Sequence, residues 1–167
     1  MKQINRQHAV MEPETHLDLE SRLTDRHQLS LRTWLRLLST AVKIETEIRT
    51  RLRIQIGITL PRFDLMAQLE RHPDGLRMGE LSKRMMVTGG NITGIADQLE
   101  KELLVERVHD KSDRRSFSLK LTAAGLASFK KMARVHERWI DEMLHGLDDQ
   151  EKTQLNQLLS KVKASLP

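Results

Sequence analysis

The pattern of hydrophobic and polar positions predicts that this chain is mostly helical, with one short stretch that has the two-residue period of a strand. Apolar side chains recur every three or four residues from Arg26 to Ile56, which indicates one long helix. Gly57 is expected to end it, because glycine is common just beyond a helix C-terminus.

Three shorter helices are predicted next. The first should begin after Thr59 as its N-cap, with Pro61 in its first turn, and stop at the turn formed by residues 72–75. Two more helical patterns follow at 79–86 and 88–104.

After residue 104 the period of the pattern changes from that of a helix to that of a strand. Phe117, Leu119 and Leu121 alternate with polar residues, as in a half-buried strand. Residues 105–110 can form the preceding strand, joined to it by the polar turn 111–115. The two segments predict a β-hairpin.

Two final helices are predicted, the first from about residue 123 to residue 144. The second should start at a capping box formed by Asp148 and Glu151. Both carry more apolar side chains than so short a chain can cover: Leu126, Phe129, Trp139, Ile140, Leu155, Leu158 and Leu159. We therefore expect a homodimer whose interface is helical.

A helix-turn-helix followed directly by a hairpin is the winged form of that motif. The expected fold class is therefore mainly α with a small β-hairpin wing (α+β), with N- and C-terminal helices that form the dimer. The expected organisation is a single structural domain with four parts: a flexible arm (1–23), an N-terminal dimerisation and ligand-side helix (24–58), a winged helix-turn-helix DNA-binding lobe (59–122) and C-terminal dimerisation helices (123–167).

The predicted helix at 88–104 has an unusually small, hydrogen-bonding face opposite its apolar stripe. Glycines inside a helix cost about 1 kcal/mol each relative to alanine, so Gly90 and Gly94 need a compensating reason. Close approach of the helix to DNA supplies one, since Asn and Gln can read adenine and a threonine methyl can pack on thymine. The alternative is that the glycines only let the helix pack on a neighbour. The expected DNA contacts on this helix are Thr88, Gly89, Gly90, Asn91, Thr93 and Gln98.

The turn of the hairpin is the second candidate for DNA contact. An arginine on a narrow ribbon can enter a narrow minor groove, and a nearby carboxylate can orient its guanidinium. Taken alone, such a turn is usually a solvated loop, but after the polar helix it is expected to act as a wing. Its expected contact residues are Lys111, Asp113, Arg114 and Arg115.

Composition narrows the function classes. Cysteine is absent, which excludes disulfides, thiolate catalysis and thiol-based redox sensing, and fits a cytoplasmic location. The net charge of +5 tolerates a polyanionic partner, while 3% aromatic residues and no tyrosine argue against a stacking surface for single strands. The sequence contains no run of 18 apolar residues, so no membrane span is predicted. The first 23 residues lack the apolar region of a signal peptide.

From about Leu60 to Gly125 the chain resembles the MarR (multiple antibiotic resistance regulator) family. The resemblance rests on five segments taken together: residues 79–82, 87–93, 99–107, 113–115 and 119–125. It implies an obligate homodimer whose two recognition helices enter successive major grooves of a pseudo-palindromic operator. In that arrangement Arg115 is the minor-groove arginine and Asp113 orients it. Met78 departs from the family pattern, which usually has a Ser or Thr helix cap there.

The resemblance also implies a small-molecule effector, because members commonly bind an anionic or aromatic ligand between the dimer helices and the DNA-binding lobe. The candidate lining residues are Trp34, Arg36, Leu38, Arg62, Phe63 and Met66. Some relatives respond to acyl-CoA thioesters of aromatic acids, whose phosphates would suit Arg49, Arg51 and Arg53. The alternative is that the apolar members of the first set are ordinary core residues.

The sequence therefore predicts a double-stranded DNA-binding regulator, a repressor released by an aromatic acid or its acyl-CoA thioester. The alternative is an architectural DNA-binding protein with weak sequence preference and no ligand switch. An enzyme is not expected, because no nucleophile elbow, phosphate-binding loop or paired His/carboxylate motif is present. The seven histidines are scattered without ligand spacing, so neither a metal site nor a cofactor is expected.

Overall fold

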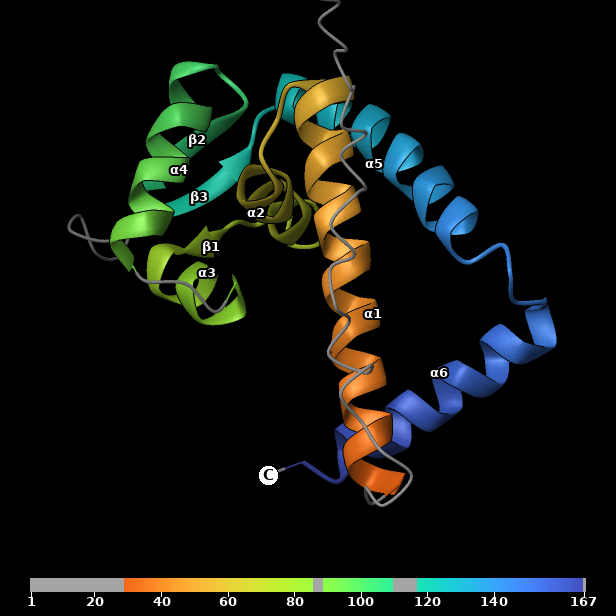
Figure 1. The fold of residues 1–167 in the computed structure, drawn as a ribbon. Coiled ribbons are helices and arrows are strands. Elements are labelled where there is room, and N and C mark those ends of the chain that lie inside the picture. The colour runs from red at the N-terminus through yellow and green to blue at the C-terminus, as the bar shows by residue number, and fades with distance from the viewer. Residues whose placement is uncertain (1–28, 86–88, 110–116, 167) are drawn as a thin grey trace, which may run out of the picture. The chain divides into compact units, whose positions relative to one another are not determined.

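The computed structural model describes residues 29–85, 89–109 and 117–166 (Figure 1). The chain divides into two compact units, Met1–Glu45 and Thr46–Pro167. The boundary falls within helix α1 (Leu29–Arg51), so the described part of the first unit is the N-terminal portion of that helix. No helix of the described residues is both long and apolar enough to cross a lipid bilayer.

The predicted long first helix is confirmed, and it ends as expected at Gly57. After α1 the chain makes a wider π-helical turn, η2 (Leu52–Ile56), which the sequence pattern does not predict. Gly57 then adopts a left-handed conformation with φ +78° and donates its backbone N–H to the Leu52 carbonyl. Glycine is favoured there because it has no Cβ to clash in that conformation.

Three helices form the body of the second unit: α2 (Leu60–Glu70), α3 (Met78–Met85) and α4 (Gly89–Lys101). Their inward side chains make a closely packed core in which the largest fully buried residues of these helices are Leu65, Met66, Leu69, Leu81, Ile92 and Leu99. Thr59 occupies the N-cap position of α2, but its side chain makes no capping hydrogen bond. The start of α2 therefore has the predicted proline in its first turn and the predicted N-cap residue, but not the side-chain capping bond.

Helix α4 ends at Lys101, earlier than the predicted residue 104. Leu103 lies in the left-handed region with φ +59°, which no α-helix can continue through. The Leu104 N–H bonds back to the Leu99 carbonyl at 2.9 Å, as in a Schellman C-cap. A leucine in place of the usual glycine concealed this helix end from the sequence pattern.

The described strands form a three-stranded antiparallel sheet in the order β1-β3-β2 (Figure 1). The predicted hairpin is confirmed as β2 (Val105–His109) and β3 (Phe117–Leu121), with the fully buried Leu119 on the central strand. β1 (Leu76–Arg77) was not predicted, because two residues are too few to show an alternating pattern. Gly75 permits its pairing: with φ +89°, a Cβ at this position would lie 2.9 Å from the Leu119 carbonyl oxygen.

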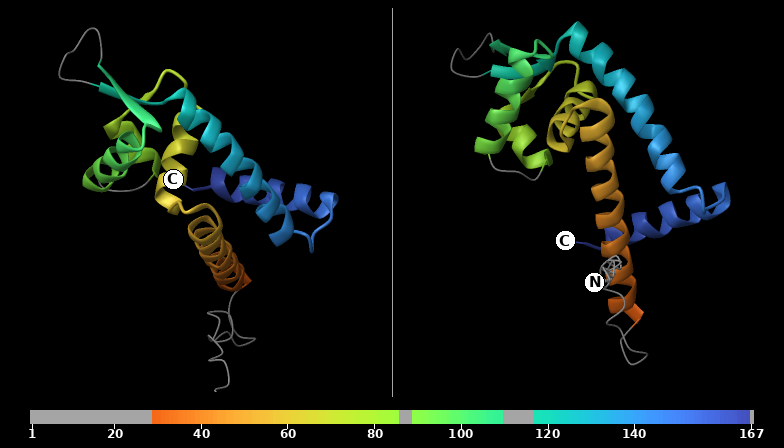
Figure 2. Two further views of the ribbon diagram at one scale, coloured as in Figure 1. Left: turned by 90° about the horizontal axis from the view of Figure 1, so that it is seen from above. Right: turned by 45° about the horizontal axis from the view of Figure 1, so that its top comes forward.

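The long helix α5 (Ala123–Met143) begins directly where β3 ends (Figure 2). Thr122 caps it by accepting the Gly125 N–H at 2.9 Å, and its hydroxyl donates to the Leu103 carbonyl at 2.8 Å. Gly125 lies so close to the end of α4 that an added Cβ would be 1.8 Å from the Leu104 carbonyl oxygen. The end of α4 and the start of α5 therefore form one tight junction.

The last helix, α6 (Asp149–Ala164), starts at the predicted capping box of Asp148 and Glu151, which is confirmed. None of its residues is buried within this chain. Its exposed apolar side chains include Leu155, Leu158, Leu159 and Val162. The excess apolar surface expected from the sequence is thus present on α6. The expectation was wrong for Phe129 and Trp139 of α5, which this chain itself buries, at 7% and 5% exposure.

Candidate nucleic-acid interface

Helix α4 has one buried face and one exposed face made of small and polar residues. Its apolar stripe, which includes Ile92, Ile95 and Leu99, is buried against the rest of the unit. The exposed face consists of Gly89, Gly90, Asn91, Thr93, Gly94, Gln98 and Lys101. A Cβ added at any of the three glycines would meet nothing within 4 Å. Packing against the described residues therefore gives no reason for glycine at these positions.

The polar groups of this face have the chemistry that reads base edges. Asn91 and Gln98 are both exposed and carry amides, which can donate and accept at once. The Thr93 hydroxyl donates to the Gly89 carbonyl at 3.0 Å, so its proton is used within the helix. What Thr93 offers outward is its methyl group and the remaining lone pair of its oxygen.

Five of the predicted DNA contacts lie outside the described residues. They are Thr88, just before α4, and the turn residues Lys111, Asp113, Arg114 and Arg115. Their roles stay predictions. The strands that lead into and out of the turn, β2 and β3, are described and pair in register from Val105 with Leu121 to His109 with Phe117.

Arg107 joins α4 to the hairpin, a link that the sequence reasoning missed. From β2 its guanidinium forms ion pairs with Asp97 and Glu100 of α4, the latter at 2.6 Å. It also lies 5.3 Å from the ring centre of Phe117 on β3. The hydrogen bond to Asp97, opposed by desolvation and assisted by the nearby carboxylate charges, raises the pKa of Arg107 above its ordinary value. The signal in the sequence was two acids three residues apart on the helix and an arginine on the next strand.

The start of α3 is satisfied without a Ser or Thr cap. Met78 stands at the first helical position, and the Arg77 backbone N–H donates to the Glu80 carboxylate at 3.2 Å. This contact is the half of a capping box that a glutamate provides. The departure from the family pattern at Met78 is thus compensated within the same turn.

The predicted ligand-side residues fall in different surroundings. Trp34, Arg36 and Leu38 belong to the first unit, where Trp34 is 54% exposed. Phe63 and Met66 lie on α2 and are buried in the core of the second unit, at 6% and 0% exposure. Arg62, also on α2, forms an ion pair with Glu102 after the end of α4. These positions do not establish a ligand site, and the predicted roles stay predictions.

A hollow of about 510 Å³ lies between α2, α3 and α5 within the second unit. Phe63 lines it and stands 5.4 Å from Phe129 and 5.0 Å from His136, measured between ring centres. Arg71 and Arg84 line the same hollow. Asp64 also lines it, so the hollow carries one acidic side chain beside the two arginines. Burial lowers the pKa of His136 below its ordinary value of 6.5.

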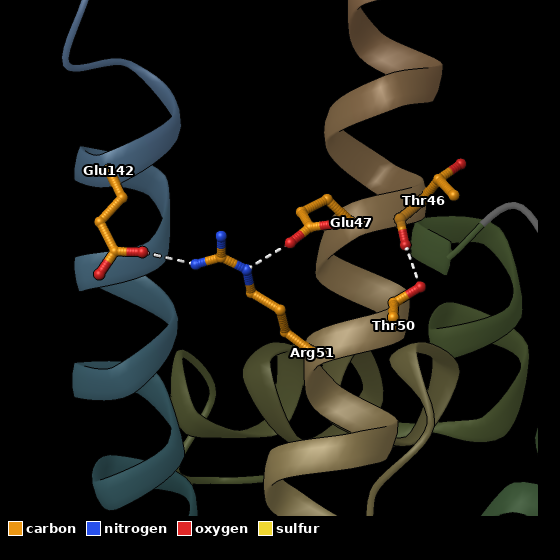
Figure 3. A network of polar contacts seen from close by, with 5 residues as sticks. All are labelled: Thr46, Glu47, Thr50, Arg51 and Glu142. Atoms are coloured by element: carbon orange, nitrogen blue, oxygen red, sulfur yellow. Dashed lines mark hydrogen bonds and ion pairs between the residues drawn. The ribbon is translucent and has the colours of Figure 1, made fainter. Parts of the chain in front are cut away.

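The predicted phosphate contact Arg51 is held by two carboxylates (Figure 3). Its Nε bonds to Glu47 on the same helix at 2.7 Å, and a terminal nitrogen bonds to Glu142 on α5 at 2.6 Å. The guanidinium lies 5.9 Å from the ring centre of Trp139. Hydrogen bonds to the two carboxylates raise the pKa of Arg51 above its ordinary value, and the bond to Glu47 contributes more than the bond to Glu142. Arg51 thus joins α1 to α5 through its own charge partners.

The other two predicted phosphate contacts, Arg49 and Arg53, are exposed. Among the described residues, no group of three or more histidines and acids is placed to hold a metal ion.

Comparison with known proteins places the chain among bacterial regulators. A model of the MarR family matches residues 58–117. The crystal structure of a MarR family transcriptional regulator from Silicibacter pomeroyi is 36% identical, with a TM-score of 0.70, covering 87% of this chain and 100% of that one. The HTH-type transcriptional repressor MdtR of Bacillus subtilis (strain 168) is 29% identical over 72% of this chain and 76% of its own length.

A solved MepR–DNA complex from S. aureus is similar in fold, with a TM-score of 0.66 at 21% identity over 84% of this chain and 99% of that one. The relatives from Silicibacter pomeroyi and Bacillus subtilis are both described as regulators of transcription.

Proposed function

The chain belongs to the MarR family of DNA-binding transcriptional regulators, and we propose that it acts as a homodimeric, sequence-specific repressor released by a small aromatic anion. The observation that carries the DNA-binding part is the exposed face of α4. It combines two amide side chains with glycines whose Cβ positions open onto empty space. A helix that must lie deep in a major groove gains from this absence of side-chain bulk.

In the proposed complex, the two α4 helices of the dimer enter successive major grooves of a pseudo-palindromic operator. Asn91 and Gln98 read base edges, and the methyl group of Thr93 packs against thymine. Arg115, oriented by Asp113, enters the flanking minor groove, where the negative potential is enhanced. Lys111 and Arg114 contact the backbone near the wing.

Selection of bound duplexes from a random library tests this proposal. A specific repressor should keep an affinity ratio of at least ~10³ between the selected operator and a random duplex in a salt titration, and an architectural protein should show almost none. Asn91→Ala should relax base preference at one position at a cost of about 1–3 kcal/mol. Asn156→Ala, at an exposed asparagine of α6, is the matched control and should leave the preference unchanged. Equal affinities for all duplexes would favour the architectural alternative.

The proposed dimer rests on the apolar face of α6, whose leucines are exposed in the described part of the chain. Placing a charge there by Leu158→Glu, at a leucine that is 51% exposed, should shift the protein from dimer to monomer in sedimentation velocity. Lys161→Glu on the same helix introduces the same side chain at an exposed polar position and should leave the dimer intact. A Leu158→Glu protein that remains dimeric would contradict this interface.

For the effector, we propose the hollow between α2, α3 and α5. Its volume of about 510 Å³ suits a small molecule. The rings of Phe63, Phe129 and His136 offer an apolar base, and Arg71 and Arg84 offer guanidinium groups for a carboxylate. A ligand in it touches both α3 of the DNA-binding lobe and α5, the helix that leads toward α6.

A thermal-shift screen of aromatic acids and their CoA thioesters, repeated with operator DNA, tests the ligand switch. A true effector should raise the melting temperature of the free protein and release the duplex. Arg84→Gln should remove the response, whereas Arg138→Gln, on α5 outside the hollow, should preserve it. Arg53→Gln should weaken the response to a CoA thioester more than to the free acid. A panel that neither stabilises the protein nor releases DNA would refute ligand release by this class.

A further inference from the structure

Arg107 sits on the sheet face that points under α4. In the β2–β3 register it lies opposite the buried Leu119, so the two side chains share one face of the sheet. From there its two terminal nitrogens reach Asp97 and Glu100 separately, the second at 2.6 Å. Its guanidinium also lies 5.3 Å from the ring centre of Phe117. One arginine of the hairpin thus holds two acids of α4.

Asp97 lies at a position on α4 where its negative charge affects DNA binding in the proposed complex. Asp97 follows Gly94 by three residues and Thr93 by four, so it lies beside them on the face proposed to enter the groove. An ionised carboxylate at that place faces the field of the DNA phosphates. Glu100 adds a second negative charge at the edge of the same face. Unless they are neutralised, the two acids oppose the approach of α4 to the duplex.

We propose that Arg107 is a positioning residue for DNA recognition, which neutralises Asp97 and Glu100, draws their carboxylates toward the sheet and fixes α4 on the hairpin. The inference rests on the proposed role of α4 as the recognition helix. It requires no contact between Arg107 and DNA. It makes the affinity for DNA depend on the charge balance of these three side chains, and not on the arginine alone.

A charge-neutralisation cycle tests this. Arg107→Gln should lower the affinity for operator DNA at least about tenfold at low salt, the effect of placing like charges together at an interface. The loss should shrink as salt screens the exposed carboxylates. Asp97→Asn with Glu100→Gln in the Arg107→Gln background should restore affinity to within about threefold of wild type. Lys131→Gln, which removes one positive charge at an exposed position of α5, is the control for net charge and should change affinity less than about twofold.

The rescue separates this role from others. If the triple variant binds as weakly as Arg107→Gln, the arginine acts by touching DNA itself, and the proposal is overturned. It is also overturned if folded Arg107→Gln binds like wild type. Circular dichroism checks folding, and if Arg107→Gln does not fold, Arg107→Lys enters the same cycle: it keeps the charge but not the two-pronged geometry, and the same two neutral substitutions should restore its loss.

Running the cycle on both operator and random duplex separates the two levels of inference. Equal wild-type affinity for the two duplexes would refute the proposed sequence-specific function. The charge coupling is measured on either duplex, because phosphate repulsion is independent of sequence.

Discussion

Replacing Gly94 by alanine should make the protein more stable and its complex with DNA weaker. Gly94 lies inside α4, where glycine costs about 1 kcal/mol relative to alanine. A Cβ built on it meets nothing within 4 Å, so the methyl group fits the free protein without strain. The free energy of unfolding should therefore rise by about 0.5–1 kcal/mol.

The effect on DNA binding has the opposite sign, because the same methyl group points to the surface that we propose lies in the groove. Adding a methyl group to a closely packed contact typically costs about 1–3 kcal/mol. That corresponds to about a thirtyfold loss of operator affinity at the middle of the range. Urea unfolding at fixed protomer concentration measures the first quantity, and fluorescence anisotropy with labelled operator measures the second.

Gly79→Ala is the matched control, since Gly79 is also an exposed helical glycine with nothing within 4 Å, but on α3. It should stabilise the protein and leave the affinity for operator unchanged. Two results would refute the reasoning on Gly94. Unchanged binding would mean that the small face of α4 does not lie against DNA. A loss of stability would mean that the face packs on another part of the protein.

Two further outcomes are expected. Gly125→Ala should lower the free energy of unfolding by about 3 kcal/mol or more. The added Cβ would lie 1.8 Å from the Leu104 carbonyl oxygen, so the Thr122 hydrogen bonds at this junction would have to break. An unchanged midpoint of urea unfolding would contradict this prediction. Burial lowers the pKa of His136 below 6.5, so the unfolded chain binds the proton more readily than the folded one and the free energy of unfolding falls as the pH drops below about 6.5. His136→Gln should therefore lose less stability between pH 7.5 and pH 5.5 than wild type, and equal losses would disprove the assignment.

Local patterns predicted most of the fold. The helical periods located α1 to α6 to within a few residues, because each helix carries apolar side chains at three- and four-residue steps, whether this chain buries them, as on α2 to α5, or leaves them exposed, as on α6. The alternation at Phe117–Leu121 located β3, since that strand has one buried face. The capping box at Asp148 and Glu151 was readable because all its partners lie within four residues. The exposed face of small residues on α4 was also predicted, because all of its residues lie within one helix.

Features set by contacts between distant residues could not be predicted in this way. β1 pairs with β3 more than 40 residues later, and its two residues carry no periodic signal of their own. Arg107 pairs with carboxylates of another element, and Arg51 pairs with Glu142 of another helix as well as with Glu47 four residues earlier on its own. The contacts with other elements depend on the fold and not on the neighbouring sequence. Arg51 was accordingly predicted as a phosphate contact, although the structure gives it two carboxylate partners of its own.

The contacts around α4 bear on how an effector would act. At its C-terminal end, the Leu103 and Leu104 carbonyls accept hydrogen bonds from Thr122 at 2.8 Å and 3.1 Å, directly before α5. Along its length Arg107 ties it to the hairpin, so α4 is fixed to both the sheet and the start of α5. In the proposed switch, a ligand between α2, α3 and α5 would therefore move α4 as a rigid body instead of bending it, and in the proposed dimer this would change the separation of the two α4 helices. Hydrogen exchange should then show unchanged protection of the α4 amides when an effector releases the operator, and loss of that protection would show instead that release proceeds by local unfolding of α4.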